Sequence, residues 1–280
     1  MSKRPISGLD EHQKAFVKLV ETNARRHRKH EVFRDFCEMA AISLSNAVDL
    51  AQAARREARY LHIVGRYERE EVDRFPQMLA HIVQSLEAGM HDCLGQLFMS
   101  LELGDHWKGQ YFTPYSVAYL MAELGCGEVS ALVDAHGYFT ANEPAAGAGA
   151  MVIALADCVR NKGLNYQRCL HVTAQDLDET AVHMSYIQLT LLHIPAIVMH
   201  GNSLWPKDTD QSWFTAAHVL DGWSGRLARE RASTSDASII VPARTPSAPE
   251  VTPAAHSAPQ VKSRPTKPRF VDQAQISLFD

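Results

Sequence analysis

A turn of small residues between a strand-like and a helix-like segment constrains this chain more than any other feature. The stretch Glu-Pro-Ala-Ala-Gly-Ala-Gly, residues 143–149, follows a short apolar run at 138–141 and opens into a helix predicted over 150–162. Glycines let a backbone approach a ligand closely, and the amide groups at a helix start point toward what is bound there. Alone, the pair Gly147 and Gly149 leaves two interpretations open, a ligand-binding turn and a turn that needs glycine only for packing.

Strand and helix patterns alternate around this turn. Strands are predicted at 138–141, 170–174 and 196–200, and helices at 150–162 and 179–193. Such alternation is typical of an α/β fold with a parallel sheet and crossover helices. Asp176 and Asp178 follow the second strand. In nucleotide-binding sites, an acidic residue at that strand end accepts hydrogen bonds from ribose hydroxyls. Asp178 directly precedes the predicted helix and suits its N-cap. We therefore assign Asp176 to the ligand and Asp178 to the cap.

The first part of the chain is predicted to be helical. Apolar residues recur at helical spacing through residues 10–104, and those from Leu79 to Leu101 are predicted to lie along one face of a long helix. A basic cluster at 25–30 fits either contact with nucleic-acid phosphates or a solvated helix end. His27 and His30 have no second cluster of ligands to join them, so no metal site is predicted.

Composition excludes several classes of protein. No apolar run reaches about 18 residues and the start lacks the apolar stretch of a signal peptide, so we expect a cytoplasmic protein without a membrane span. The five cysteines are scattered, with no Cys-x-x-Cys pair, and predict buried thiols. Residues 106–204 carry 4 Lys and Arg against 8 Asp and Glu, an acidic balance that disfavours direct gripping of a DNA duplex.

Four motifs together resemble those of a known family. They are Gly-Gln-Tyr-Phe-Thr-Pro at 109–114, Glu-Pro-Ala-Ala-Gly-Ala-Gly at 143–149, Gln-Asp-Leu-Asp at 175–178 and His-Gly-Asn-Ser-Leu at 200–204. Their order and rough spacing resemble those of the N-6 adenine DNA methylases, and most of all the modification subunits of type I restriction systems. The resemblance covers residues 106–204 well and the helical start only in general character.

This resemblance implies S-adenosylmethionine as the cofactor and a shortened Rossmann-like methyltransferase sheet. By the resemblance, the segment from Gln110 to Pro114 would lie over the methionine part of the cofactor and Gly147 to Gly149 beneath it. Asp176 would hold the ribose hydroxyls, and Asn202 would lie near the adenine. The implied cofactor-binding set is Gln110, Tyr111, Phe112, Thr113, Pro114, Glu143, Gly147, Ala148, Gly149, Asp176 and Asn202.

One motif of that family is missing. The family's chemistry depends on Asn or Asp followed by Pro-Pro and an aromatic residue, which hold and stack on a flipped adenine. The chain contains no Asn-Pro, Asp-Pro or Pro-Pro dipeptide, so no catalytic residue is assigned. Trp213 and Phe214 occupy the expected region and fit either base stacking, with Asp208 or Asp210 as hydrogen-bond acceptors, or packing of a shortened sheet.

The end of the chain changes character. Residues 233–274 are rich in Pro, Ser, Thr and Ala and predict a disordered linker. The last residues, Gln275, Ile276, Ser277, Leu278 and Phe279, resemble the pentapeptide that binds the bacterial sliding clamp, with Leu278 and Phe279 as apolar anchors and Gln275 as a hydrogen-bonding group. The alternative is a tail that folds back onto an exposed edge of its own domain.

These observations predict four segments and leave two functions open. The segments are a helical domain at 1–105, a methyltransferase-like domain at 106–232, a linker at 233–274 and a clamp-binding peptide at 275–280. The first function is an adenine-specific DNA methyltransferase acting on DNA, with a second methyltransferase or specificity subunit completing the site. The second is a catalytically silent accessory protein that binds the cofactor and is recruited by the clamp.

Overall fold

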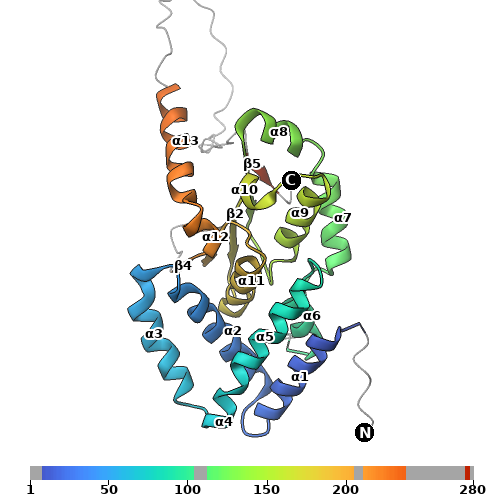
Figure 1. Ribbon diagram of the computed structural model, residues 1–280, viewed down its shortest axis with the longest axis vertical. Helices are drawn as coiled ribbons and strands as arrows, with labels where there is room; N and C mark the ends of the chain where they lie inside the picture. Colours follow the sequence, from blue (N-terminus) through green and yellow to red (C-terminus); the bar gives the residue numbers. More distant parts are fainter. Residues whose placement is uncertain (1–7, 104–111, 205–210, 238–274, 278–280) are drawn as a thin grey trace, which may run out of the picture. The chain divides into compact units, whose positions relative to one another are not determined.

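The computed structural model describes residues 8–103, 112–204, 211–237 and 275–277 (Figure 1). The chain divides into two compact units, one made of Met1–Trp223 with Ala274–Asp280 and the other of Ser224–Gln273. The helical start and the sheet therefore belong to the same unit. Of the second unit, the structure describes only the part that belongs to helix α13 (Trp223–Ala237).

The predicted helical start is confirmed. It forms α1 (Glu11–Asn23), α2 (Lys29–Asn46), α3 (Leu50–Val64), α4 (Arg69–Val72), α5 (Arg74–Glu87) and α6 (Cys93–Ser100). Helix α1 begins with a capping box, in which Asp10 accepts from the Gln13 backbone and the Gln13 side chain accepts from Asp10. The rings of Phe33 and Phe36 meet Phe16 edge-on, with ring centroids 6.1 and 4.9 Å away, and all three are buried.

The expectation of one long helix through Leu79 and Leu101 is wrong, because the chain breaks between α5 and α6. Asp92 ends the break and accepts a 2.9 Å hydrogen bond from the Gly95 backbone, which starts α6 as an N-cap does. Most of the apolar side chains on both sides of the break are buried all the same, whereas Leu79 and Val83 are half-buried. Apolar periodicity therefore identified the buried face and missed the capping signal at Asp92.

The sheet contains five strands in the order β4-β3-β2-β1-β5. They are β1 (Phe139–Glu143), β2 (Leu170–Asp176), β3 (Ala196–His200), β4 (Gln211–Phe214) and the three-residue β5 (Gln275–Ser277). Strands β1, β2, β3 and β5 are parallel, and β4 runs antiparallel to β3. The predicted α/β class is confirmed, and Asp176, His200 and Gln211 are register partners at one end of the sheet.

Helices connect and cover the strands. The connections are α9 (Ala150–Asn161) and α10 (Tyr166–Cys169) after β1, and α11 (Glu179–Leu191) after β2, which confirms the predicted crossover helices. Helix α11 packs on β2 and β3 and also on α2, so the helical start and the sheet share one core. Before β1, α7 (Tyr115–Gly125) packs on α9, and α8 (Val129–His136) contacts β1; α12 (Ala216–Leu220) follows β4.

Two predictions about the rest of the chain can be compared with these elements. Residues 233–237, predicted as the start of the linker, form the end of α13, and residues 238–274 lie outside the described part of the chain. Over the described ranges, no single helix is long and apolar enough to cross a membrane, and only the bent pair α7 and α8, at 59° to each other, passes on length and composition.

Candidate functional site

The glycine turn links β1 to α9 in a conformation that requires its glycines. Gly147 and Gly149 have φ angles of +54° and +98°, in the region that L side chains rarely adopt. A Cβ on Gly147 would lie 2.9 Å from the ring of Phe112, and one on Gly149 would lie 3.3 Å from Ser185 Oγ. Close packing therefore accounts for both glycines, and a ligand-binding role needs separate evidence.

Hydrogen bonds hold the turn against the end of β2. The Ala146 N–H donates to the Gln175 carbonyl at 2.9 Å, and the Gly147 N–H donates to Asp176 Oδ2 at 2.8 Å. The other oxygen of Asp176 accepts from the Asp178 N–H at 2.9 Å. Asp176, predicted from sequence as the ligand-binding acid, therefore lies directly beside the glycine turn.

Asp178 has the capping role that the sequence predicts. Its side chain accepts from the backbone N–H groups of Thr180 and Ala181, at 2.7 and 3.2 Å, at the start of α11. The capping role of Asp178 is thus confirmed, and the ligand-binding role of Asp176 stays a prediction.

The aromatic arm of the first motif reaches the same place. The ring of Phe112 lies over Gly147 and packs on Phe98 of α6, with ring centroids 4.9 Å apart. Thr113 and Pro114 are exposed, and Pro114 is the N-cap residue of α7. Gln110 and Tyr111 lie outside the described residues, so their predicted contacts with a cofactor stay predictions.

Two neighbouring carboxyl groups dominate the electrostatics of the site. Glu143 at the end of β1 is completely buried; Oε1 accepts from the Ala145 N–H at 3.0 Å and Oε2 has no hydrogen-bond partner. Burial, and then the nearby charge of Asp176, raise the pKa of Glu143 to about 7, although the Ala145 N–H opposes the shift. Burial also raises the pKa of Asp176, against the hydrogen bonds from the Asp178 and Gly147 N–H groups.

No described lysine, arginine or histidine forms an ion pair with either carboxyl group. A buried acceptor without a partner carries a large desolvation cost. The arrangement of Glu143 and Asp176 therefore favours a ligand that brings a positive charge or hydroxyl donors to this end of the sheet.

Three buried polar side chains around the turn escaped prediction. Ser185 Oγ, beside Gly149, and Gln175 Nε2, one residue before Asp176, have no hydrogen-bond partner. Gln188 of α11 donates to the Ala148 carbonyl at 2.8 Å and to Asp92 Oδ1 at 2.9 Å, and accepts from the Leu94 N–H at 3.0 Å. Gln175 stands in the motif at 175–178 but had no assigned role, and Ser185 and Gln188 were marked only by their polarity on an otherwise apolar helix, a signal that does not specify a partner.

Asn202 follows β3 close to the end of β2. The Gly201 N–H donates to the Asp176 carbonyl at 2.9 Å, which ties the two strand ends together. Asn202 Oδ1 accepts from the Leu204 N–H at 2.9 Å, within its own turn. The predicted contact of Asn202 with an adenine therefore competes with a local hydrogen bond.

The two aromatic residues of β4, Trp213 and Phe214, differ in burial. Trp213 is buried against His183 and Tyr186, with ring centroids at 4.9 and 5.3 Å, as the packing alternative predicts. Phe214 is half-buried and packs on His218, with ring centroids 5.1 Å apart. Asp208 and Asp210 lie outside the residues that the structure describes.

The basic cluster at 25–30 covers the turn between α1 and α2 and the first two residues of α2, and half of its side chains have acidic partners. Arg26 pairs with Glu68 and His27 with Glu71, both at 3.3 Å, and Lys29 lies 3.7 Å from Glu21. These pairs fit the solvated-turn alternative better than a phosphate-binding surface. Within the described residues, no group of three or more His, Cys, Asp or Glu side chains is arranged to hold a metal ion.

The C-terminal peptide pairs with the sheet. Gln275, Ile276 and Ser277 form β5 and are register partners of Thr140, Ala141 and Asn142 in β1. For these three residues the arrangement is the one expected of a tail that folds back onto its own domain. Leu278 and Phe279 lie outside the described residues, and clamp binding stays a prediction.

A comparison with family models decides the family. Residues 100–220 match the model of the N-6 DNA methylases, a stretch that includes the aromatic arm, the glycine turn, Asp176 and Asn202. This region, residues 100–220 of the 280, belongs to the N-6 DNA methylase family. The match to this methylase family ends before α13 and the C-terminal peptide.

Solved structures similar to this methylase family member are distant. One is a Listeria monocytogenes protein assigned to the class I S-adenosylmethionine-dependent methyltransferases, with a TM-score of 0.39 and 14% identity over 70% of this chain and 55% of that one. Another is the methyltransferase subunit of a type I restriction-modification system from Streptococcus thermophilus, with a TM-score of 0.34 and 12% identity over 72% of this chain and 59% of that one. The chain thus spans less than two thirds of either structure. A comparison with curated protein sequences found no match.

Proposed function

We propose that this N-6 DNA methylase family protein binds S-adenosylmethionine at the carboxyl ends of β1 and β2 and takes part in methyl transfer to adenine N6 in DNA. The observation that carries the proposal is the buried oxygen of Glu143 without a partner, next to Asp176 and the glycine turn. Family membership supplies the reaction type.

The residues present fit this cofactor in their chemistry. S-adenosylmethionine carries an ammonium group, a sulfonium methyl and ribose hydroxyls, and when bound it supplies the electrophilic methyl group. Asp176 keeps lone pairs free for hydroxyl donors beyond its two backbone hydrogen bonds, and Glu143 offers an acceptor without a partner. Phe112 and the Gly147 turn would bound the cofactor and exclude water from it.

The acceptor side is proposed to come from another chain, because the Asn/Asp-Pro-Pro-aromatic motif is missing from this one. Two features of the described residues support such a partner. The outer side of β1 is covered only by the three residues of β5, and displacement of this short strand would open the edge to strand addition by a partner. Helix α7 exposes Val117, Leu120, Met121 and Leu124 at i, i+3, i+4 and i+7, and these side chains are between 37% and 78% exposed.

Transfer of label from radioactive S-adenosylmethionine to unmethylated genomic DNA tests this proposal. The chain alone is expected to be inactive, and the chain together with the products of neighbouring genes is expected to label DNA. Leu124→Lys is expected to reduce the labelling while leaving cofactor binding unchanged, because the substitution alters only the exposed face of α7. Labelling that is as strong without this chain as with it would reject the proposal.

The second candidate function, a silent accessory protein, is favoured by the missing acceptor motif alone. In this case the last residues would bind a bacterial sliding clamp, and pairing of β5 with β1 would compete with that binding. A peptide of the last dozen residues is expected to bind the clamp and to lose binding on Phe279→Ala. Binding that survives this substitution would reject the clamp assignment.

A further inference from the structure

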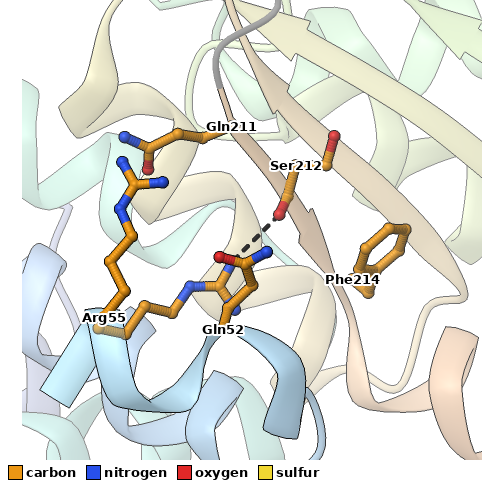
Figure 2. Close-up of a pocket in the computed structure, with 6 residues that line it drawn as sticks. Gln52, Arg55, Gln211, Ser212 and Phe214 are labelled. Carbon is orange, nitrogen blue, oxygen red and sulfur yellow. Dashed lines mark hydrogen bonds between the residues drawn. The ribbon is translucent and has the colours of Figure 1, made fainter.

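A polar pocket lies outside the candidate cofactor site, between α3 and β4. It has a volume of about 210 Å³ and is lined by Gln52, Arg55, Arg56, Gln211, Ser212 and Phe214 (Figure 2). No aspartate or glutamate is among these lining residues. Among the described strands, β4 is the last one of the sheet on this side, so the pocket lies along the outer edge of β4.

The strand edge contributes backbone donors to the pocket. The Thr215 N–H donates to the Ala196 carbonyl at 3.1 Å, which makes Thr215 and Ala196 a bonded pair of the antiparallel ladder. Bonded pairs alternate along such a ladder, so the N–H groups of Ser212 and Phe214 point away from β3. Neither N–H group has a partner within the described part of the chain, whereas the Ser212 carbonyl accepts from Arg56 at 3.0 Å.

The arginines of α3 have different roles. Arg56 is buried and fully engaged, since it donates to Asp49 at 2.8 Å and to Ser45, and its guanidinium lies 4.0 Å from the centroid of the Trp213 ring. It fixes α3 against β4. Arg59 is neutralised by Glu38, at 2.5 Å.

Arg55 is left as the available positive charge. Its side chain is exposed and has no carboxylate partner among the described residues. Figure 2 shows its guanidinium and the side-chain amide of Gln211 pointing toward one another. An uncompensated guanidinium beside strand-edge N–H groups and amide donors favours an anion, and phosphate oxygens match guanidinium geometry.

An adjoining pocket indicates on which side of Arg55 an anion is preferred. It has a volume of about 170 Å³ and shares Arg55, Arg56 and Gln211, but its lining also includes Glu38 and Glu179. Arg59, which also lines this pocket, neutralises Glu38, and the remaining carboxylate of Glu179 disfavours an anion on that side. The anion is therefore expected on the Phe214 side, where an aromatic ring is available for stacking with a sugar or base.

We propose that the pocket of Arg55, Gln211, Ser212 and Phe214 binds a nucleotide phosphate, either free or within a DNA strand. The position of the pocket suits a phosphate within a DNA strand. Gln211 is the register partner of His200, and His200 of Asp176, so the pocket begins two strands away from the candidate cofactor site, at the same end of the sheet. The inference that the phosphate belongs to DNA rests on the proposed function, whereas the inference that the pocket binds a phosphate does not.

Fluorescence anisotropy with the full chain tests this proposal, with a labelled single-stranded oligonucleotide, the duplex of the same sequence, and unlabelled dAMP and inorganic phosphate as competitors. Arg55→Ala is expected to weaken oligonucleotide binding roughly tenfold and to reduce the slope of log K against log salt by about 0.7. Arg55→Glu is expected to weaken it further. Binding of dAMP in a calorimeter that depends on Arg55, without binding of the labelled oligonucleotide, would assign the pocket to free nucleotides.

The matched control is Arg69→Ala, since Arg69 of α4 is also exposed and has no ion-pair partner among the described side chains. It is expected to bind like the wild type. The proposal is overturned if wild type binds none of the four probes, if both Arg55 variants bind like wild type, or if Arg69→Ala weakens binding equally. Calorimetry with S-adenosylmethionine on the same variants separates this outcome from failure of the cofactor site, because Arg55 lies outside that site.

Discussion

The side-chain amide of Gln188 donates a 2.8 Å hydrogen bond to the carbonyl oxygen of Ala148, inside the glycine turn. The same amide also donates to Asp92, the N-cap residue of α6 in the helical start. One buried glutamine thus connects the helical start to the turn that forms the candidate cofactor site. This link adds to the shared hydrophobic core of the two regions, which belong to one compact unit.

Loss of the Gln188 link is expected to affect both stability and the turn. Gln188→Leu keeps the volume of the side chain but leaves the Ala148 carbonyl, the Leu94 N–H and the buried Asp92 without this partner. We expect the free energy of unfolding in urea to fall by about 2–4 kcal/mol. Gln84→Leu, at an exposed position of α5, is the control and is expected to change it by less than about 0.5 kcal/mol. Equal stability of Gln188→Leu and wild type would contradict this role.

Two of the glycines with positive φ allow backbone strain to be separated from packing. Gly149 and Gly163 have φ angles of +98° and +79°, but only at Gly149 would a Cβ meet another atom, Ser185 Oγ at 3.3 Å. Gly163→Ala is expected to cost about 1–2 kcal/mol from the left-handed backbone alone. Gly149→Ala should cost more, because Ser185 must also move. Thermal unfolding of the two variants side by side checks this, and the reverse order would be inconsistent with the packing at Gly149.

Glu143 is expected to make the ligand-free protein less stable at alkaline pH. Its pKa of about 7 in the folded state lies above the ordinary value of 4.5, so folding takes up a proton between these pH values and stability falls as pH rises from 4.5 to 7. Glu143→Gln removes this penalty, which is about 3 kcal/mol at most by pH 8. Urea unfolding at pH 5 and pH 8 should show a stabilised variant only at the higher pH. Glu128→Gln, at an exposed position, is the control.

Two adjacent arginines are expected to differ sharply in their effect on folding. Arg56→Ala leaves the largely buried Asp49 without its ion-pair partner and removes the guanidinium from the Trp213 ring, so a loss of about 3–5 kcal/mol is expected. Arg55→Ala exposes no such group and is expected to stay within about 0.5 kcal/mol of wild type. Similar unfolding midpoints for both variants would show that Arg56 does not fix α3 against β4.

Removal of residues 275–280 is expected to expose the edge of β1. Thr140, Ala141 and Asn142 would lose their pairing with β5, and a free parallel strand edge promotes association between chains. Light scattering should show concentration-dependent association of the truncated chain. Gln275→Pro is the matched variant, since proline removes one backbone donor from β5. A truncated chain as monodisperse as wild type would indicate that β5 does not protect this edge.

The sequence predicted the elements with the strongest periodicity and turn chemistry. The crossover pattern around Gly147 and the cap at Asp178 follow from local rules that act over a few residues, and the structure agrees with both. The break at Asp92 was missed because apolar spacing continues across it. The hydrogen bond between Gln188 and Asp92 and the ion pairs of Arg26 and His27 join residues that lie dozens of positions apart in the sequence. No local sequence pattern encodes such contacts.

The candidate site was predictable in its position and less so in its electrostatics. Family motifs pointed to Phe112, Gly147 and Asp176, and these residues do adjoin one another. The buried, unpaired state of Glu143 and the donor-rich pocket at β4 depend on tertiary packing. Both features lie at strand ends, and these ends are brought together only in the folded protein.

Titration of the purified chain with S-adenosylmethionine in a calorimeter tests the central claim most directly. We expect one site per chain in the wild type, with affinity that rises with pH through about 7 as Glu143 ionises, and strong loss of binding in Asp176→Ala. Asp134→Ala, on the exposed face of α8, should bind like the wild type. No heat of binding in the wild type, or equal binding by Asp176→Ala, would contradict the account.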